Sequence, residues 1–290
     1  MKSKVLILGA SGMLGVSILR YFYEEDIYEV YGSVRSNEYQ ETLSLYQTVL
    51  IPDISNFKKL KKTISNLRPN FVINCIGIIK QHNLSSDYIQ SIIINSLFPH
   101  QLASICKSIN AKLIHFSTDC VFNGVNGNYD EKHPPCSNDI YGLTKTLGEI
   151  NYDNHLTIRT SIIGHELKTN VSLVDWFLNQ KHSVNGYNKA YFSGLATIHL
   201  AEILHNFLLD EKIYGLYHLS SVRISKYELL NKIKEKYNKE ITINKSSSVQ
   251  IDRSLNSERI QKKYGISIKS WDDQIEMMHK EYTKYFNLKE

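Results

Sequence analysis

Three spaced glycines near the amino terminus constrain this chain more than any other feature of its sequence. Gly9, Gly12 and Gly15 follow a continuous apolar run at residues 5–8 and open a segment with helical periodicity at residues 14–23. A glycine turn between a buried strand and a helix lets the backbone approach a pyrophosphate, and the helix directs free N–H groups at that anion. Spaced glycines also occur in plain tight turns, but this position at a strand–helix junction favours a dinucleotide site.

Strand and helix patterns alternate through the first half of the chain. Apolar runs without period-two alternation, joined by helical segments, predict a parallel sheet that is covered by helices on both faces. The predicted strands are residues 5–8, 29–34, 48–51, 71–76, 112–116 and 157–159. The predicted helices are residues 14–23, 55–67, 87–109 and 141–151. We therefore expect an α/β fold with a Rossmann-type, doubly wound parallel sheet.

The regular alternation weakens after about residue 160. Later segments predicted to be regular are helices at residues 171–179, 197–209, 225–236, 257–264 and from 270 onward, and a strand at residues 215–219. Ser225 and Glu228 have the spacing of a capping box at the start of one helix. We expect residues 1–160 to form the dinucleotide-binding domain, with residues 190–222 returning to it. Residues 161–290 would mainly form a smaller α/β substrate-binding lobe.

Composition argues against several classes of protein. The chain has 290 residues, 42% of them hydrophobic, and a formal net charge of +5 carried by scattered lysines, which does not indicate a nucleic-acid-binding stripe. No apolar run approaches the roughly 20 residues that span a bilayer, and no signal-peptide pattern is present. The four cysteines lack C-x-x-C spacing and the histidines do not cluster. We expect a cytoplasmic protein with reduced thiols, no membrane association and no metal site.

Tyr141 and Lys145 place a phenol and an ammonium on one face of a predicted helix. An ammonium within about 4–6 Å favours the phenolate by roughly one to three pKa units. The spacing alone proves nothing in a chain with 19 tyrosines, and Tyr285 and Lys289 repeat it near the carboxyl terminus. Context has to distinguish the two pairs.

The fifth predicted strand supplies that context, because it ends in Ser117, Thr118 and Asp119 shortly before Tyr141. Ligands of parallel sheets bind at the carboxyl ends of the strands, where the first glycine turn also lies. A glycine turn, strand-end hydroxyls and Tyr-x-x-x-Lys therefore follow one another in the order that a catalytic site requires. Tyr285 has no such neighbours.

These motifs resemble the extended short-chain dehydrogenase/reductase superfamily and, within it, the dTDP-4-dehydrorhamnose reductases of bacterial polysaccharide synthesis. Residues 117–124, Ser-Thr-Asp-Cys-Val-Phe-Asn-Gly, are similar to that family's Ser-Thr-Asp-Tyr-Val-Phe-x-Gly. Residues 141–149, Tyr-Gly-Leu-Thr-Lys-Thr-Leu-Gly-Glu, are similar to its Tyr-Gly-x-Ser-Lys-x-x-Gly-Glu. Asn95 falls where the superfamily has an asparagine that kinks a helix and supports the lysine. The resemblance covers nearly the whole chain and is strongest before about residue 160.

The chain also departs from the family at several positions. Cys120 replaces the family's usual tyrosine, which changes the wall of the sugar pocket. The segments at residues 74–81 and 159–165 and the lobe after them differ as well. These departures leave the redox chemistry intact and leave the identity of the sugar open.

The resemblance implies roles for three catalytic residues, Thr118, Tyr141 and Lys145. Lys145 would hold the nicotinamide ribose and lower the pKa of Tyr141, which would protonate the substrate carbonyl while hydride arrives. Thr118 would donate a hydrogen bond to the same oxygen as negative charge develops. Ser117 and Asp119 would mainly shape the end of the strand.

The expected ligand contacts follow from the fold and the resemblance. The expected cofactor-binding residues are Gly9, Ser11, Gly12, Met13, Leu14, Gly15, Ser33, Arg35, Asp53, Ile54, Cys75, Ile76, Gly77, Asn95, Tyr141 and Lys145. The expected substrate-binding residues are Lys80, Thr118, Asp119, Cys120, Tyr141, Trp176 and Arg253. Trp176 has the apolar helical spacing that is also typical of a core residue. Arg253 lies near the place where the family has an arginine followed by a serine.

The end of the second predicted strand indicates which nicotinamide cofactor binds. A site selective for NAD has a carboxylate about 20 residues past the glycine turn, at the end of that strand. Here the strand ends without an acid, and Ser33 and Arg35 are suited to a 2′-phosphate. We expect NADPH, with NADH also possible, and Asp53 near the adenine.

The sequence therefore predicts NADPH-dependent reduction of the 4-keto group of a nucleotide-linked 4-keto-6-deoxy-hexose, for bacterial surface polysaccharide synthesis. Two alternatives stay open. One is an epimerase, or a reductase of another keto-sugar. The other is a non-catalytic regulatory subunit that binds NADP, since such a subunit of methionine adenosyltransferase resembles the same family. The expected partner is a nucleoside-diphosphate sugar, and a homodimer is compatible with the sequence.

Overall fold

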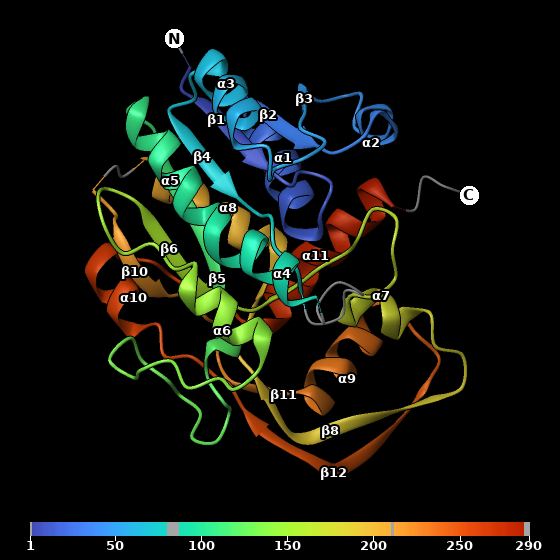
Figure 1. The fold of residues 1–290 in the computed structure, drawn as a ribbon. Coiled ribbons are helices and arrows are strands. Elements are labelled where there is room, and N and C mark those ends of the chain that lie inside the picture. The colour runs from blue at the N-terminus through green and yellow to red at the C-terminus, as the bar shows by residue number, and fades with distance from the viewer. Residues whose placement is uncertain (1, 80–86, 210–211, 287–290) are drawn as a thin grey trace.

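A seven-stranded sheet whose neighbouring strands are all parallel forms the centre of the computed structural model, which describes residues 2–79, 87–209 and 212–286 (Figure 1). The strand order is β10-β6-β5-β4-β1-β2-β3. The strands are β1 Lys4–Leu8, β2 Glu29–Val34, β3 Thr48–Leu50, β4 Phe71–Asn74, β5 Lys112–Thr118, β6 Leu156–Thr160 and β10 Gly215–His218. The order reverses beside β1, so the predicted Rossmann-type, doubly wound sheet is confirmed.

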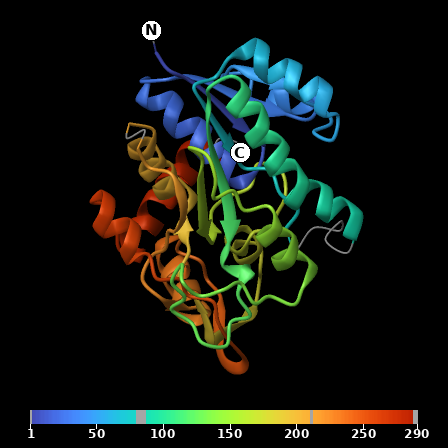
Figure 2. The same cartoon turned by 60° about the vertical axis from the view of Figure 1, so that its left-hand side comes forward.

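Alternate side chains of the sheet enter two separate cores, which explains why the strands read as continuous apolar runs. Val5 and Ile7 of β1 pack with α1 (Met13–Glu25) and α8 (Thr197–Leu209) on one face. The other face packs with α3 (Phe57–Leu67) and α5 (Phe98–Ser108). Figure 2 shows the sheet nearly edge-on between these layers.

Of the remaining helices that the structure describes, only α9 and α11 exceed eight residues. They are α2 Asn37–Thr42, α4 Tyr88–Ser91, α6 Ile140–Leu147, α7 Leu173–Leu178, α9 Lys226–Lys236, α10 Glu258–Tyr264 and α11 Trp271–Tyr285. A π-helical turn, η2 (Ile92–Leu97), separates α4 from α5, so the helix predicted at residues 87–109 is not continuous. A 3₁₀ turn, η3 (Asp119–Val121), follows β5 directly. None of the helices in the described ranges has the length and apolar character needed to cross a membrane.

A second, smaller sheet lies at one end of the molecule, near the bottom of Figure 1. Its order is β11-β8-β12, with β8 at Ser183–Phe192, β11 at Ile224–Ser225 and β12 at Thr242–Asp252. A separate two-stranded pair joins β7 (Ile162–Ile163) to β9 (Leu195–Ala196). Apolar side chains of α7, α9 and α11 form a core against β8. The predicted smaller α/β lobe is therefore present, whereas the domain boundaries stay a prediction.

Candidate active site

The glycine turn between β1 and α1 is a cradle that fits the pyrophosphate of a dinucleotide. Gly9 has a φ of +78°, and its N–H donates to the Ser33 hydroxyl at 3.0 Å. A Cβ on Gly15 would lie 2.2 Å from the Gly9 carbonyl oxygen, so only glycine lets the helix approach the turn this closely. In α1, which the structure describes from end to end, the N-cap is Gly12 and the first turn has no acidic residue. The first N–H groups of α1 are therefore directed at a position suited to an anion.

The other residues predicted at this turn, Ser11, Met13 and Leu14, lie at the start of α1. Ser11 and Met13 are half-buried and Leu14 is buried. Since the backbone rather than these side chains forms the cradle, their contacts with a cofactor stay predictions.

The end of β2 lies directly beside the glycine turn. Ser33 is buried, and its hydroxyl accepts the Gly9 N–H, so it orders the turn. Arg35 is exposed just past the strand, with its guanidinium carbon 5.7 Å from the centre of the Tyr39 ring. The structure thus gives Ser33 a contact within the protein and leaves Arg35 the more accessible of the two predicted phosphate ligands.

Asp53 and Ile54 follow β3 on the next loop. The Asp53 carboxylate accepts the N–H and the hydroxyl of Ser55 at 2.8 and 2.6 Å. These hydrogen bonds lower the pKa of Asp53 below its usual value. Ile54 is half-buried against the core. Both residues lie near the edge where the adenine is expected, and their roles stay predictions.

Asn95, on the π-helical turn η2, holds residue 78 in the segment that directly follows β4. Its side-chain oxygen accepts the Ile78 N–H at 2.9 Å, and its amide donates to the Ile78 carbonyl at 3.0 Å. Gly77 borders the Lys145 ammonium, because a Cβ there would lie 3.4 Å from Asn95 Oδ1 and 3.9 Å from Lys145 Nζ. The two residues before it, Cys75 and Ile76, are half-buried. Residues 75–79 are therefore held beside the lysine, and the support of Lys145 by Asn95 that the resemblance implies stays a prediction.

Helix α6 brings Tyr141 and Lys145 to the carboxyl end of β5. The Tyr141 phenol lies beside the Thr118 side chain, and the buried Lys145 ammonium donates to the Phe116 carbonyl at 2.6 Å. The structure thus brings together all three residues predicted to be catalytic, which lie 27 positions apart in the sequence at most.

Burial dominates the electrostatics of this pair. Burial raises the pKa of Tyr141, the charges of Cys120 and Asp119 act in the same direction, and the contact with Thr118 only partly opposes them. Burial also lowers the pKa of Lys145 to about 8, although the Glu149 carboxylate opposes that shift. The expectation that Lys145 lowers the pKa of Tyr141 stays a prediction.

A buried ion pair between Arg159 and Glu149 holds the carboxyl end of β5 in place. Arg159 on β6 donates two hydrogen bonds of 2.7 Å to the carboxylate of Glu149, and the Ser117 hydroxyl donates to the same carboxylate at 2.6 Å. The side chains of Arg159 and Glu149 are only 5% and 8% exposed. Ser117 consequently shapes the strand end, in agreement with the role expected for it.

Asp119 and Cys120 follow the catalytic threonine in the turn η3. Thr118 donates to the Asp119 carboxylate at 3.2 Å and accepts the Cys120 N–H at 3.1 Å. Asp119 is buried, and Cys120 is half-buried. These contacts order the threonine and support a structural role for Asp119.

Lys226, the first residue of α9, lies near the turn after β5 and was not among the predicted site residues. Its ammonium lies 4.1 Å from the centre of the Phe192 ring. Burial lowers its pKa to about 8, while the nearby Asp119 and Cys120 oppose the shift. A second ammonium therefore faces the end of β5 from the smaller lobe. The capping box at Ser225 indicated where α9 begins, but nothing in the sequence indicated which strand end it faces.

The remaining predicted substrate residues lie in different surroundings. Trp176 is 38% exposed on α7, whereas its neighbours Val174 and Phe177 are buried, so its apolar spacing does not make it a core residue. Arg253 follows β12, and its Nε donates to the Phe122 carbonyl at 2.9 Å. Lys80 lies outside the described residues. Substrate contacts by all three stay predictions.

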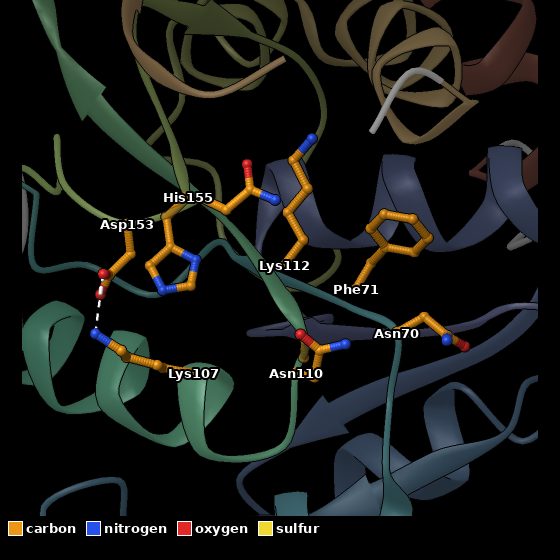
Figure 3. Close-up of a pocket in the computed structure, with 9 residues that line it drawn as sticks. Asn70, Phe71, Lys107, Asn110, Lys112, Asp153 and His155 are labelled. Carbon is orange, nitrogen blue, oxygen red and sulfur yellow. Dashed lines mark hydrogen bonds and ion pairs between the residues drawn. The ribbon is translucent and has the colours of Figure 1, made fainter. Parts of the chain in front are cut away.

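A cavity of about 420 Å³ lies at the starts of β4, β5 and β6, at the opposite end of β5 from Thr118 (Figure 3). Its lining includes Asn70, Lys112 and His155, and Lys107 pairs with Asp153 at 3.0 Å. The cavity contains none of the predicted site residues. In the described ranges no three His, Cys, Asp or Glu side chains are arranged to hold a metal ion.

Comparison with known proteins identifies the family. Residues 3–284 match the sequence profile described as the RmlD substrate binding domain. The chain belongs to this family. A probable low-salt glycan biosynthesis reductase of Haloferax volcanii is 30% identical over 144 residues, which cover 49% of this chain and 46% of the relative. The chain thus spans about half the length of that curated relative. The methionine adenosyltransferase 2 beta subunit of Xenopus tropicalis is 25% identical, and the match covers 81% of this chain and 72% of that one.

Solved structures agree with the family assignment. A hypothetical dTDP-4-dehydrorhamnose reductase from Sulfolobus tokodaii has a TM-score of 0.76 at 30% identity, over 90% of this chain and 94% of that one. The dTDP-4-dehydrorhamnose reductase of Bacillus anthracis, solved in complex with NADP, has a TM-score of 0.81 at 22% identity, over 97% and 100%. The second likeness shows the fold alone. Family membership agrees with the predicted short-chain dehydrogenase/reductase fold, in which Thr118, Tyr141 and Lys145 gather at one strand end.

Proposed function

We propose that this member of the RmlD substrate binding domain family reduces the 4-keto group of a nucleotide-linked 4-keto-6-deoxy-hexose with NADPH, in the synthesis of surface polysaccharide. The observation that carries the proposal is the gathering of Tyr141, Thr118 and Lys145 at the carboxyl end of β5. These residues form a proton donor and a hydrogen-bond donor for one carbonyl oxygen.

The residues present fit a dinucleotide at the adjoining glycine turn. The turn and the amino end of α1 would hold the pyrophosphate, Lys145 the nicotinamide ribose and Arg35 the 2′-phosphate. When bound, NADPH supplies a hydride for the carbonyl carbon.

Tyr141 supplies the proton in this proposal. Because burial raises the pKa of its phenol, Tyr141 stays protonated at neutral pH and has a proton to give. The Thr118 hydroxyl hydrogen-bonds the same oxygen as negative charge develops on it. Lys145, four residues further along α6 and held on the Phe116 carbonyl, would offset the negative charge that remains on the phenol after proton transfer.

The nucleotide-sugar part of the proposal rests on chemistry and on the relatives. The ammonium of Lys226 lies close to the strand-end residues Asp119 and Cys120, where a substrate carrying negative charge would find a cation. The names of the Sulfolobus and Bacillus proteins specify dTDP-4-dehydrorhamnose. We therefore take that compound as the first substrate to test.

The test is to incubate the purified protein with NADPH and 4-keto-6-deoxy-hexoses linked to dTDP, UDP, GDP and CDP, and to follow the nicotinamide absorbance. Oxidation of NADPH with one of these sugars, and formation of the reduced sugar, is the expected result. Absence of oxidation across the whole panel would count against the reductase.

Other observations separate the two alternatives. An epimerase would retain NAD tightly through purification and convert its sugar without net oxidation. A regulatory subunit would co-purify with a partner enzyme and keep its effect in the Tyr141→Phe variant. The similarity to the methionine adenosyltransferase beta subunit keeps this second alternative worth testing. The homodimer and the cytoplasmic location stay predictions.

A further inference from the structure

A second cation lies beside Arg35, and it comes from the other half of the chain. The Lys168 ammonium is 4.6 Å from the centre of the Tyr39 ring, and the Arg35 guanidinium carbon is 5.7 Å from the same ring. Lys168 also pairs with the Glu38 carboxylate at 2.5 Å. Two cations and one carboxylate thus gather just past the end of β2.

The loop at residues 164–172, between β7 and α7, presents Lys168 at this place. A Cβ on Gly164 would lie 3.3 Å from Met13 Cγ, so the loop passes close to the amino end of α1. Leu167 packs against the same core as Tyr39. The Glu166 carboxylate accepts the N–H groups of Val171 and Ser172 at 2.9 and 3.1 Å and ties the loop to its own base.

The end of β2 is where this fold holds the adenosine ribose, and the hydrogen bond from Gly9 to Ser33 places it against the pyrophosphate cradle. A carboxylate here suits the free 2′-hydroxyl of NADH and repels the 2′-phosphate of NADPH. Glu38 is 71% exposed and lies in the first turn of α2, four residues past the end of β2. The Lys168 ammonium neutralises it.

We propose that Lys168 is a specificity residue for NADPH: it neutralises Glu38 and, together with Arg35, forms a two-cation site for the 2′-phosphate. The inference rests on the cofactor part of the proposed function. It assigns cofactor selectivity to a loop that leads into the smaller lobe, and not only to residues at the end of β2.

Binding tests this inference without turnover. The dissociation constants of 2′,5′-ADP, 5′-ADP, NADPH and NADH would be measured by calorimetry for the wild type and for Lys168→Ala. We expect the variant to bind 2′,5′-ADP and NADPH about tenfold or more weakly, as the loss of a charge-assisted contact implies, and to bind 5′-ADP and NADH within about twofold of the wild type. Lys168→Arg should restore most of the loss.

Lys107→Ala is the matched control, because Lys107 makes an exposed ion pair with Asp153 at the far end of the sheet. It should leave all four constants unchanged. Exposed ion pairs add little to stability, so both alanine variants should fold. Equal weakening of 5′-ADP and 2′,5′-ADP in Lys168→Ala, or no change in either, would overturn the inference.

The variant Lys168→Ala/Glu38→Gln tests the neutralising role separately. It should bind 2′,5′-ADP more tightly than Lys168→Ala, because the repelling carboxylate is gone. Equal affinity would contradict that role. These binding results can be separated from those of the reductase assay. Selective binding of 2′-phosphates without reduction of any keto-sugar would contradict the proposed reaction and still support this inference.

Discussion

Tyr141 and Lys145 have pKa values shifted in opposite directions by the same cause, burial in one site. The Tyr141 pKa is raised, and the Lys145 pKa is lowered to about 8. Each shift favours the neutral form of its side chain. The Tyr141 phenol therefore keeps its proton, whereas keeping the Lys145 ammonium charged lowers the free energy of unfolding. A proton donor and a readily titrated cation therefore lie within one turn of α6.

The Lys145 shift predicts a pH-dependent stability. Because the folded pKa of about 8 lies below the usual 10.5, the unfolded chain binds more protons between these values, and stability rises with pH across that window. The penalty is fully present below pH 8. Lys145→Met should therefore be more stable than the wild type at pH 7 by up to about 3 kcal/mol. Its advantage should shrink as the pH rises through 8 to 10.5.

Urea unfolding of both proteins at neutral and alkaline pH measures this difference. Lys107→Met, at an exposed ion pair, is the control and should show no pH-dependent gain. A gain for Lys145→Met that is the same at every pH would mean that burial of the ammonium is not its cause.

Lys226 should affect binding of the sugar nucleotide and not of the dinucleotide. We expect Lys226→Met to raise KM for the keto-sugar about tenfold, as the loss of a charged contact implies, while the affinity for NADPH stays the same. Lys232→Met is the control on the same helix, where Lys232 pairs with Asp272 at 2.6 Å on the surface. Steady-state kinetics distinguish the two. An unchanged KM would remove Lys226 from the substrate site.

Residue-level prediction succeeded where a local motif carries the chemistry. The order and spacing of the motifs around Thr118 and Tyr141 predicted that these residues share a site, and the structure brings them close together. Lys226 and Lys168 could not be found in this way, because each meets its neighbours only through the packing of distant segments.

At the scale of elements, two glycines of the first turn have different tasks. A Cβ on Gly15 would meet backbone at 2.2 Å, whereas a Cβ on Gly12 would meet, among described atoms, only the Gly9 oxygen at 3.4 Å. Gly15 therefore permits α1 to pack, and Gly12 leaves space for a ligand.

Two substitutions should separate these tasks. Gly15→Ala should lower the free energy of unfolding by more than about 2 kcal/mol, the range typical of overpacking against a rigid backbone. Gly12→Ala should leave stability nearly unchanged and weaken NADPH binding at least about tenfold. Thermal unfolding and calorimetry measure the two effects. Normal NADPH binding by Gly12→Ala would argue against a pyrophosphate at this turn.

Some elements could not be predicted for identifiable physical reasons. In the π turn η2, the Asn95 side chain hydrogen-bonds to the backbone of Ile78, outside the helix. The spacing of apolar residues in the sequence does not indicate such a contact. Strand β12 is mostly exposed and rich in serine and lysine, so it lacks the apolar alternation that marks a half-buried strand. Strand β8 was not predicted, because asparagine and glycine interrupt its alternation of apolar and polar residues. The central strands, which are buried on both faces, were the easiest to predict from the sequence.

At the scale of the whole molecule, the last helix ties the smaller lobe to the dinucleotide-binding helix. Glu281 on α11 accepts the Ser17 hydroxyl of α1 at 2.7 Å and lies 3.8 Å from the Arg20 guanidinium. The Arg20 and Glu281 side chains are only 7% and 4% exposed. Burial raises the pKa of Glu281 and lowers that of Arg20, so each charge depends on the other.

Replacing one partner of this ion pair should therefore lower the free energy of unfolding more than replacing both partners together. Glu281→Leu leaves a buried guanidinium without its carboxylate and should destabilise the fold by about 3–5 kcal/mol. The double variant Glu281→Leu/Arg20→Met should recover much of that loss. Denaturant unfolding of the single and double variants measures the coupling. If the two variants are equally unstable, the pair does not act as a unit.

The central claim, that Tyr141 protonates a ketone as hydride reaches its carbon, is tested most directly by isotope transfer. The protein would be given dTDP-4-dehydrorhamnose and NADPH deuterated on either face of its ring, and the product would be analysed by mass spectrometry. We predict that deuterium from one face appears at C4 of the sugar, and that Tyr141→Phe binds NADPH normally but transfers the label at least about 100-fold more slowly. A reduced sugar without label, or unslowed transfer by Tyr141→Phe, would contradict the claim.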